Sequence, residues 1–284
     1  MSLGETFKKI RNNKNLKQKF FLKKGLSQSM ISYFENDSRK LEVENFIHIL
    51  EKLNMSLEEF KLVQSNYILN EREEIIKRYY LLKVNNYETI QELIDILEKY
   101  LMENNDIMLE HILIICKGLS ILSLSDNIEE ARKIIQSVWS YYEKKDFWYL
   151  NELKIINSIL FVFNSSNVLH IANLMLKNLS RYPDTIETIN LKLNIRTNIV
   201  ILMMEAREWN NAFKLLNENL NLFKLEMNYL FLVIHYNRIA ICMYKLNIPE
   251  YNSYIEKANM LLELIEEQGF IDRLKKEYET WINK

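Results

Sequence analysis

Residues 26–36 read LSQSMISYFEN, and this stretch decides how the N-terminal part of the chain folds. Ser27 is a favourable N-cap for a helix that begins directly after it. Met30, Ile31 and Phe34 recur at helical spacing and therefore predict the buried side of that helix. The opposite face, near the N-terminal half of that helix, points outward and carries mostly short, polar side chains. They are Gln28, Ser29, Ser32 and Tyr33.

Further helices are expected on the N-terminal side of this stretch. Leu3, Phe7 and Ile10 form one apolar stripe, and a second short helix at 18–24 ends at Gly25. The chain must also turn after residue 35. The residues there that best adopt a left-handed backbone without being glycine are Asn36 and Asp37.

Two helices are expected on the C-terminal side. One lies in VENFIHILEKLNMSLEEF (residues 43–60), and the next opens with the capping box Ser56-Leu-Glu-Glu59. The inward residues expected for the first of these are Val43, Phe46, Ile47, Leu50 and Leu53. Residues 1–64 thus predict a compact domain of five helices.

The composition extends the helical prediction to the whole chain. The 284 residues are 48% hydrophobic and 26% charged, with four glycines and two prolines. Glycine-dependent turns with a positive φ are therefore scarce, and so are the glycines and prolines that typically occur at sheet edges and bulges. We expect an all-α protein and exclude collagenous, disordered and multi-stranded β classes.

Charge is distributed very unevenly along the chain. Residues 1–41 carry a net charge of +7, and the other 243 residues carry −8. Such a charge asymmetry favours an N-terminal domain, the head, that binds a polyanion, and a body that does not. The alternative is a solvated basic face that has no partner.

The N-terminal residues resemble the five-helix helix-turn-helix domain of the Cro/repressor (XRE) class. Gln18 opens the second helix, LSQSMISYFEN follows, and then the amphipathic segment at 43–60. Asp37 stands where that class usually has glycine, and the interval from Gln18 to Ser27 is one residue short. With that shortened turn, the chain looks more like the Rgg/MutR branch of peptide-responsive regulators than like phage repressors.

The resemblance implies a reader of double-stranded operator DNA. Amide and hydroxyl side chains at a helix start can reach base edges in the major groove, and nearby cations and helix N-termini hold phosphates. The candidate contacts are Lys17, Gln18, Ser27, Gln28, Ser29, Ser32, Tyr33, Asn36, Arg39 and Lys40. The alternative is a small helical subdomain that binds no nucleic acid.

The rest of the chain predicts stacked helical hairpins. After a linker at 65–70, residues 71–284 show a period near 40, which is similar to tetratricopeptide (TPR) repeats without their signature. Such hairpins must stack to bury their apolar faces, so we expect a right-handed α-solenoid. The expected pairs are 70–83 with 86–103, 107–124 with 127–144, 148–164 with 166–181, 185–206 with 209–225, and 228–246 with 250–267. A final helix after Gly269 caps the solenoid or crosses to a dimer partner.

Three asparagines align in the repeats. Asn157, Asn198 and Asn237 lie 41 and 39 residues apart in strongly apolar helices. A carboxamide can satisfy both the N–H and the C=O of an extended peptide, so a ladder of asparagines predicts a peptide clamp. Nearby, a carboxylate could be held by Lys154, Arg196 and Arg238, beside an apolar wall at Phe161. The alternative is that these asparagines cap or pair within the scaffold.

In the Rgg-like family, asparagines on the concave face bind a short signalling peptide. The resemblance therefore implies a cytoplasmic, homodimeric transcription regulator that takes part in quorum sensing. One alternative is a regulator or scaffold whose repeats bind a protein partner and no free peptide. Another is a scaffold whose head does not read DNA.

Enzyme, metal and membrane motifs are missing from the sequence. The four histidines are isolated, and no P-loop, dinucleotide fingerprint or nucleophile elbow is present. We therefore expect no catalysis, no metal and no cofactor. Two cysteines cannot build a disulfide framework, which favours a reducing, cytoplasmic setting. The most apolar segment expected, residues 229–244, is interrupted by His235, Asn237 and Arg238, so no membrane span is expected.

Overall fold

The computed structural model confirms the all-α prediction. It describes residues 1–82, 87–125, 127–163, 165–225, 229–265 and 268–283. Within these ranges every regular element is a helix, and the one β-type pairing is an isolated bridge between Lys23 and Leu26. Contacts divide the chain into two compact units, Met1–Leu82 and Lys83–Lys284.

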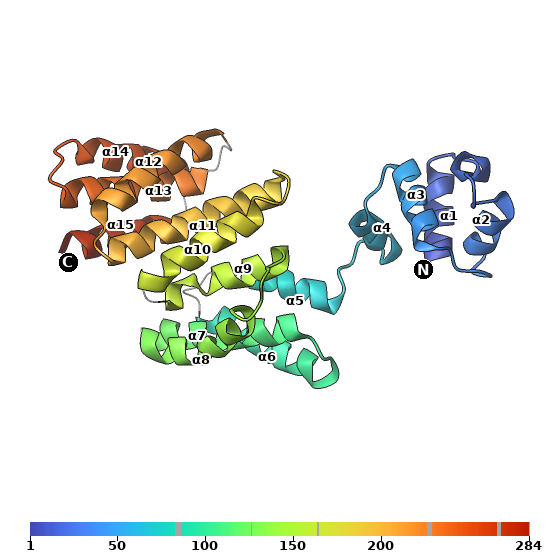
Figure 1. Ribbon diagram of the computed structural model, residues 1–284, viewed down its shortest axis with the longest axis horizontal. Coiled ribbons are helices and arrows are strands. Elements are labelled where there is room, and N and C mark those ends of the chain that lie inside the picture. Colours follow the sequence, from blue (N-terminus) through green and yellow to red (C-terminus); the bar gives the residue numbers. More distant parts are fainter. Residues whose placement is uncertain (83–86, 126, 164, 226–228, 266–267, 284) are drawn as a thin grey trace. The chain divides into compact units, whose positions relative to one another are not determined.

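The first unit contains five α-helices and one 3-10 helix (Figure 1). They are α1 (Leu3–Asn13), η1 (Gln18–Phe21), α2 (Gln28–Glu35), α3 (Val43–Leu53), α4 (Leu57–Gln64) and α5 (Glu71–Tyr80). The expected second α-helix is the 3-10 helix η1, which ends earlier than residue 24 because Leu22 is already extended. The predicted linker at 65–70 stays a prediction, since contacts group α5 with this unit.

The core of the first unit follows the predicted stripes except on α3 and at Leu3 of α1, which is 45% exposed. Phe7, Phe21, Ile31, Ile49 and Phe60 are completely buried. On α3, however, Val43 is 69% exposed and Ile47 is 49% exposed. Two overlapping stripes satisfy helical spacing here, and packing selects the one that consists of Phe46, Ile49, Leu50 and Leu53.

Several helices end in a left-handed residue although the chain has only four glycines. Asp37 has φ 55° at the end of α2, as expected, whereas Asn36 has φ −106°. Left-handed residues also follow other helices, and they include Asn15, Asn54, Asn66, Arg207 and Asn247. Most are asparagine, whose short polar side chain tolerates this conformation better than other side chains do.

The second unit consists of helices that pack in chain order (Figure 1). They are α6 (Tyr87–Glu103), α7 (Ile107–Ser125), α8 (Ile128–Tyr142), α9 (Leu150–Ser158), η2 (Leu160–Val162), α10 (Ser165–Leu179), α11 (Ile186–Glu205), α12 (Trp209–Leu225), α13 (Tyr229–Lys245), α14 (Tyr251–Ile265) and α15 (Gln268–Asn283). The predicted hairpins α7–α8, α11–α12 and α13–α14 pack as neighbours.

Two predicted elements of this region differ in the structure. The helix expected over 148–164 ends at Ser158 and continues as η2. The pair expected for 70–83 and 86–103 is split, because contacts place α5 in the first unit and α6 in the second.

The final helix, α15, packs on α13 of its own chain. Leu274 and Trp281 are its two buried residues, and Trp281 meets Trp209 with ring centroids 5.7 Å apart. Within the single chain, α15 therefore packs as a cap, which is one of the two roles that the sequence left open.

The most apolar long helix is α7, not the segment at 229–244. Among the described residues, α7 is the one helix whose length and hydropathy would allow it to cross a membrane. It packs between α6 and α8, with Leu109, Ile112 and Ile115 completely buried. This is the arrangement of a core helix.

Candidate nucleic-acid interface and asparagine clamp

The start of α2 is held by its own side chains. Ser27 Oγ accepts a hydrogen bond from the Met30 N–H at 3.3 Å, as an N-cap does, and lies 2.9 Å from Ser29 Oγ. Gln28 beside them is exposed. The first turn of α2 is therefore rigid, and its side chains and helix N-terminus face solvent.

Further along α2, the outward face combines aromatic, amide and cationic groups. Tyr33 is 47% exposed, and the Arg39 guanidinium lies 5.3 Å from the centre of its ring. Asn36 Oδ1 accepts a hydrogen bond from Lys8 Nζ at 3.2 Å, while Ser32 is half-buried. The polar surface of α2 therefore has two cations beside it, Lys8 at Asn36 and Arg39 at Tyr33.

Gln18 is anchored, together with α1 and α2, by a buried carboxylate. Its Nε2 donates to Glu35 Oε2 at 2.8 Å, and the Arg11 guanidinium donates to both Glu35 oxygens at 2.5 and 3.0 Å. The Glu35 side chain is only 3% exposed. Arg11 and Glu35 are not among the predicted site residues, although an acid directly after the apolar Phe34 is a usable signal. The role of Gln18 toward DNA stays a prediction.

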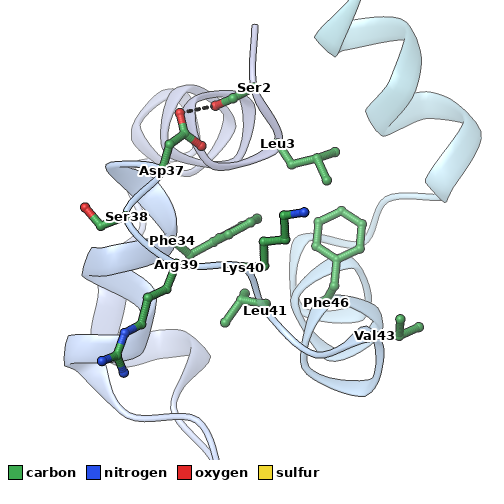
Figure 2. Close-up of a pocket in the computed structure, with 10 residues that line it drawn as sticks. All are labelled: Ser2, Leu3, Phe34, Asp37, Ser38, Arg39, Lys40, Leu41, Val43 and Phe46. Atoms are coloured by element: carbon green, nitrogen blue, oxygen red, sulfur yellow. Dashed lines mark hydrogen bonds between the residues drawn. The ribbon is translucent and has the colours of Figure 1, made fainter.

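A mostly apolar pocket of about 830 Å³ lies beside this face (Figure 2). Leu3, Phe34, Leu41, Val43 and Phe46 line it, and it is rimmed by Ser2, Asp37, Ser38, Arg39 and Lys40. Figure 2 shows the Lys40 side chain reaching toward Phe46, whereas the Arg39 side chain points away from it. These two predicted DNA contacts, Arg39 and Lys40, therefore point in different directions. Lys17, the remaining predicted contact, is exposed as the residue before η1.

In the second unit, two of the three aligned asparagines bind each other. Asn198 Nδ2 donates to Asn157 Oδ1 at 3.0 Å, between α11 and α9. Both side chains are half-buried. Within the described part of the chain, the Asn157 amide nitrogen and the Asn198 amide oxygen have no other partner. The pair thus presents one donor and one acceptor.

The third asparagine is occupied by α15. Asn237 Nδ2 lies 3.3 Å from the Leu274 carbonyl oxygen and 3.3 Å from Glu277 Oε2, and donates to both. Arg238 Nε donates to Glu277 Oε1 at 2.9 Å, and its Nη1 donates to the Thr197 carbonyl at 3.1 Å. Pairing within the scaffold, the alternative raised by the sequence, is therefore present at all three asparagines.

Arg196 belongs to a series of hydrogen-bonded polar side chains. Its Nη1 donates to Asn219 Oδ1 at 2.8 Å, and Asn219 Nδ2 lies 3.3 Å from His235 Nε2. His235 Nδ1 lies 2.9 Å from the Phe231 carbonyl, which can only accept, so Nδ1 carries the proton and Nε2 accepts from Asn219. Burial lowers the pKa of His235 to about 3, and the nearby Arg238 charge acts in the same direction. His235 is therefore neutral at pH 7.

The other two predicted clamp residues lie on α9 and η2, the helix of Asn157 and the element after it. Lys154 forms an ion pair with Glu187, and Phe161 is half-buried in η2. Asn219, His235 and Glu277 were missed as partners. Only the register of the helices brings them to the predicted residues, so no local pattern indicated them.

Other reactive groups give no sign of chemistry. Among the described residues, no three His, Cys, Asp or Glu side chains gather as metal ligands would. Burial raises the pKa of Cys116 and of Cys242 to about 12, which keeps both thiols protonated and inert. Cys116 and Cys242 are both completely buried.

Known proteins match both the head and the whole chain. The helix-turn-helix family model matches residues 7–60. The structure of the Streptococcus dysgalactiae SHP pheromone receptor Rgg2 is similar with a TM-score of 0.70 and 16% identity, over 98% of this chain and 99% of that one. The structure of Bacillus thuringiensis PlcR in complex with the peptide PapR7 and DNA is similar with a TM-score of 0.69 and 16% identity, over 99% of each chain.

A third structure, ComR from S. thermophilus in complex with DNA and its signalling peptide ComS, is similar with a TM-score of 0.64 and 15% identity, over 99% of each chain. At such identities the similarity establishes the fold. Residues 7–60 are a helix-turn-helix domain, and the chain as a whole has the fold of Rgg2, PlcR and ComR.

Proposed function

We propose that this protein is a cytoplasmic, homodimeric transcription regulator of the Rgg/MutR type. Its first unit binds double-stranded operator DNA, and its second unit binds a short signalling peptide that changes this binding. It catalyses no reaction. The single observation that carries the proposal is the exposed polar face of α2, in a basic segment that the helix-turn-helix family model matches.

The DNA-binding half rests on what α2 offers. Gln28 and Tyr33 stand out from a capped helix as groups of the kind that read base edges, while Arg39 and Lys17 are exposed cations of the kind that hold phosphates. PlcR and ComR, which share this fold, have been solved with DNA. A dimer would present two such helices to half-sites about one or two helical turns apart.

The peptide-binding half rests on the Asn157–Asn198 pair. An amide nitrogen and an amide oxygen that lack partners in the described part of the chain, on half-buried side chains, match the C=O and N–H groups of an extended peptide. Neither atom is sealed inside the described fold, so an incoming ligand can reach both. Two arginines lie nearby in the sequence register: Arg196 on α11, which donates to Asn219, and Arg238 on α13, which is paired with Glu277.

Selection from random duplex DNA tests the first half. We expect the full chain to enrich one sequence, and Gln28→Ala to lower the affinity for it by about tenfold to a hundredfold, since a lost base contact costs about 1–3 kcal/mol. The control is Gln136→Ala, which removes an exposed glutamine from α8. No enrichment by the unaltered chain would refute DNA reading.

Affinity capture of a pool of random octapeptides tests the second half. We expect the full chain to retain a subset of peptides, and Asn157→Ala and Asn198→Ala each to lose most of it. Asn211→Ala, at an exposed position on α12, should retain the subset unchanged. Equal retention by all four proteins would exclude the asparagine pair as the clamp, and no retention at all would favour a protein partner.

A further inference from the structure

The chain itself supplies a ligand to its third asparagine. Glu277 of α15 gives one carboxylate oxygen to Asn237 and the other to Arg238, at 3.3 and 2.9 Å. The Leu274 carbonyl, one turn earlier on α15, accepts a second hydrogen bond from Asn237. A carboxylate and a backbone carbonyl are the acceptors that an incoming acidic peptide would also present.

The contact lies in a dry environment. The Arg238 and Glu277 side chains are 11% and 16% exposed, and Asn237 is 7% exposed. At such burial an unpaired guanidinium is strongly disfavoured, so Arg238 requires a carboxylate partner. Loss of Glu277 without a replacement is therefore costly, and another carboxylate on Arg238 offsets that cost.

The helix that brings Glu277 packs on the rest of the unit through one face. Leu274 and Trp281 are the two buried residues of α15, Phe270, Ile271 and Tyr278 pack half-buried against the core beside them, and most of its other described side chains are exposed. An element that packs through one face separates from the fold at a lower free energy than a helix that is covered on several sides. By contrast, α13, which carries Asn237 and Arg238, is buried on most of its surface.

We propose that Asn237 and Arg238 form a carboxylate subsite of the peptide clamp, and that Glu277 is its internal occupant. The ligand class is a peptide that carries a carboxylate, at its C-terminus or on an acidic side chain, and that displaces Glu277 when it binds. Both occupants make the same two hydrogen bonds, so the exchange is a competition between an internal and an external acid. The inference rests on the proposed peptide binding.

The competition sets the apparent affinity. When Glu277 fills the subsite, only the fraction of molecules with a displaced α15 binds the peptide acid, and the observed dissociation constant rises accordingly. Glu277→Gln keeps the shape and a hydrogen bond to Asn237 but removes the charge that Arg238 requires. It should therefore tighten the binding of acidic peptides and leave that of other peptides unchanged.

Two octapeptide pools, captured on the full chain, test this. One pool has free C-termini and includes glutamate and aspartate; the other has amidated C-termini and replaces them with glutamine and asparagine. We expect Glu277→Gln to raise the affinity for the best carboxylate-bearing peptides by about tenfold and that for the carboxylate-free pool not at all. Glu279→Gln, an exposed acid on the same helix, is the matched control and should change neither.

A second measurement uses the unaltered chain and needs no variant to fold. Hydrogen exchange of the amides in residues 268–283 should rise when a retained carboxylate-bearing peptide is added, because that peptide displaces α15. Unchanged exchange, or equal affinities of the Glu277→Gln and Glu279→Gln proteins, would overturn the subsite and leave peptide binding intact. Retention of neither pool by any of these proteins would overturn both.

Discussion

At the scale of single residues, Arg207 stands where helices commonly end in glycine. It has φ 59° after α11, where its N–H and that of Glu208 donate to the Met204 and Met203 carbonyls at 3.0 and 2.8 Å. This closes the helix with the hydrogen bonds of a Schellman motif. Unlike asparagine, arginine has no short polar side chain to relieve the left-handed backbone. The fold therefore carries local strain at this turn.

Arg207→Gly should stabilise the protein. Removing the Cβ relieves about 1–2 kcal/mol of strain, and the greater freedom of glycine in the unfolded chain takes back part of it. We expect the thermal midpoint to rise by about 1–3 °C. Lys214→Gly, at an exposed position inside α12, is the control and should lower it. A lower midpoint for Arg207→Gly would mean that the arginine side chain itself stabilises the turn.

His235 makes stability depend on pH. Its pKa is lowered to about 3 by burial and by the Arg238 charge, against about 6.5 in an unfolded chain. Below pH 6.5 the unfolded chain takes up a proton that the folded chain does not, so the contribution is complete above pH 6.5 and is lost as the pH falls toward 3. The loss amounts to about 2 kcal/mol at pH 5.

Urea unfolding at several pH values measures this contribution. His235→Gln should remove about one proton from the difference in uptake between the folded and unfolded chains, so its free energy of unfolding falls less steeply between pH 6.5 and 5. His111, whose pKa burial and Lys145 also lower, acts in the same direction and remains in both proteins. Parallel slopes for the two proteins would contradict the buried neutral state of His235.

At the scale of elements, α1 and α2 approach each other through a glycine. A Cβ on Gly4 would lie 1.8 Å from the Phe34 carbonyl oxygen and 2.9 Å from Asp37 Oδ1. The contact is with backbone, which cannot move aside as a side chain tip can. The Arg11–Glu35 ion pair joins the same two helices. The presentation of α2 therefore depends on α1.

Gly4→Ala should destabilise the first unit by about 1–3 kcal/mol, the usual cost of overpacking. Thermal unfolding followed by circular dichroism measures it. Gly269→Ala is the matched control, because it also lies in a helix and nothing lies within 4 Å of a Cβ there. It should be neutral or slightly stabilising. Equal effects of the two changes would show that α1 and α2 readily move apart.

At the scale of the whole molecule, charge is divided between the two ends of the sequence. The +7 of residues 1–41 lies in the first unit, and the remainder carries −8. Since DNA binding releases the counterions that each neutralised phosphate had held, the first unit should confer a strong dependence on salt. The acidic remainder disfavours binding to DNA elsewhere on the chain.

The slope of log affinity against log salt concentration measures the phosphate contacts. Lys17→Ala should lower the affinity for all DNA sequences alike and reduce the slope by about one for each head. Lys275→Ala, an exposed lysine on α15, should leave both quantities unchanged. A loss for Lys17→Ala that is confined to the selected sequence would place Lys17 at a base.

Much of the fold was accessible from local patterns. Ser27 as a cap, Asp37 as a left-handed residue and the stripe of Ile31 and Phe34 depend only on neighbouring residues, and the structure confirms them. On α3, two stripes satisfied the same periodicity, and a single sequence cannot choose between them. The choice of Ile49 over Val43 follows from packing against the other helices.

The sequence by itself determined that the chain is helical, that its head carries the positive charge, and that its asparagines recur at a repeat distance. Composition and periodicity are local properties and need no coordinates. Only the tertiary structure decided the partner of each polar group: Asn198 for Asn157, Glu277 for Asn237, and His235 beside Asn219. These partners are separated by 16 to 41 residues, and burial forces each donor to find an acceptor wherever the packed helices bring one.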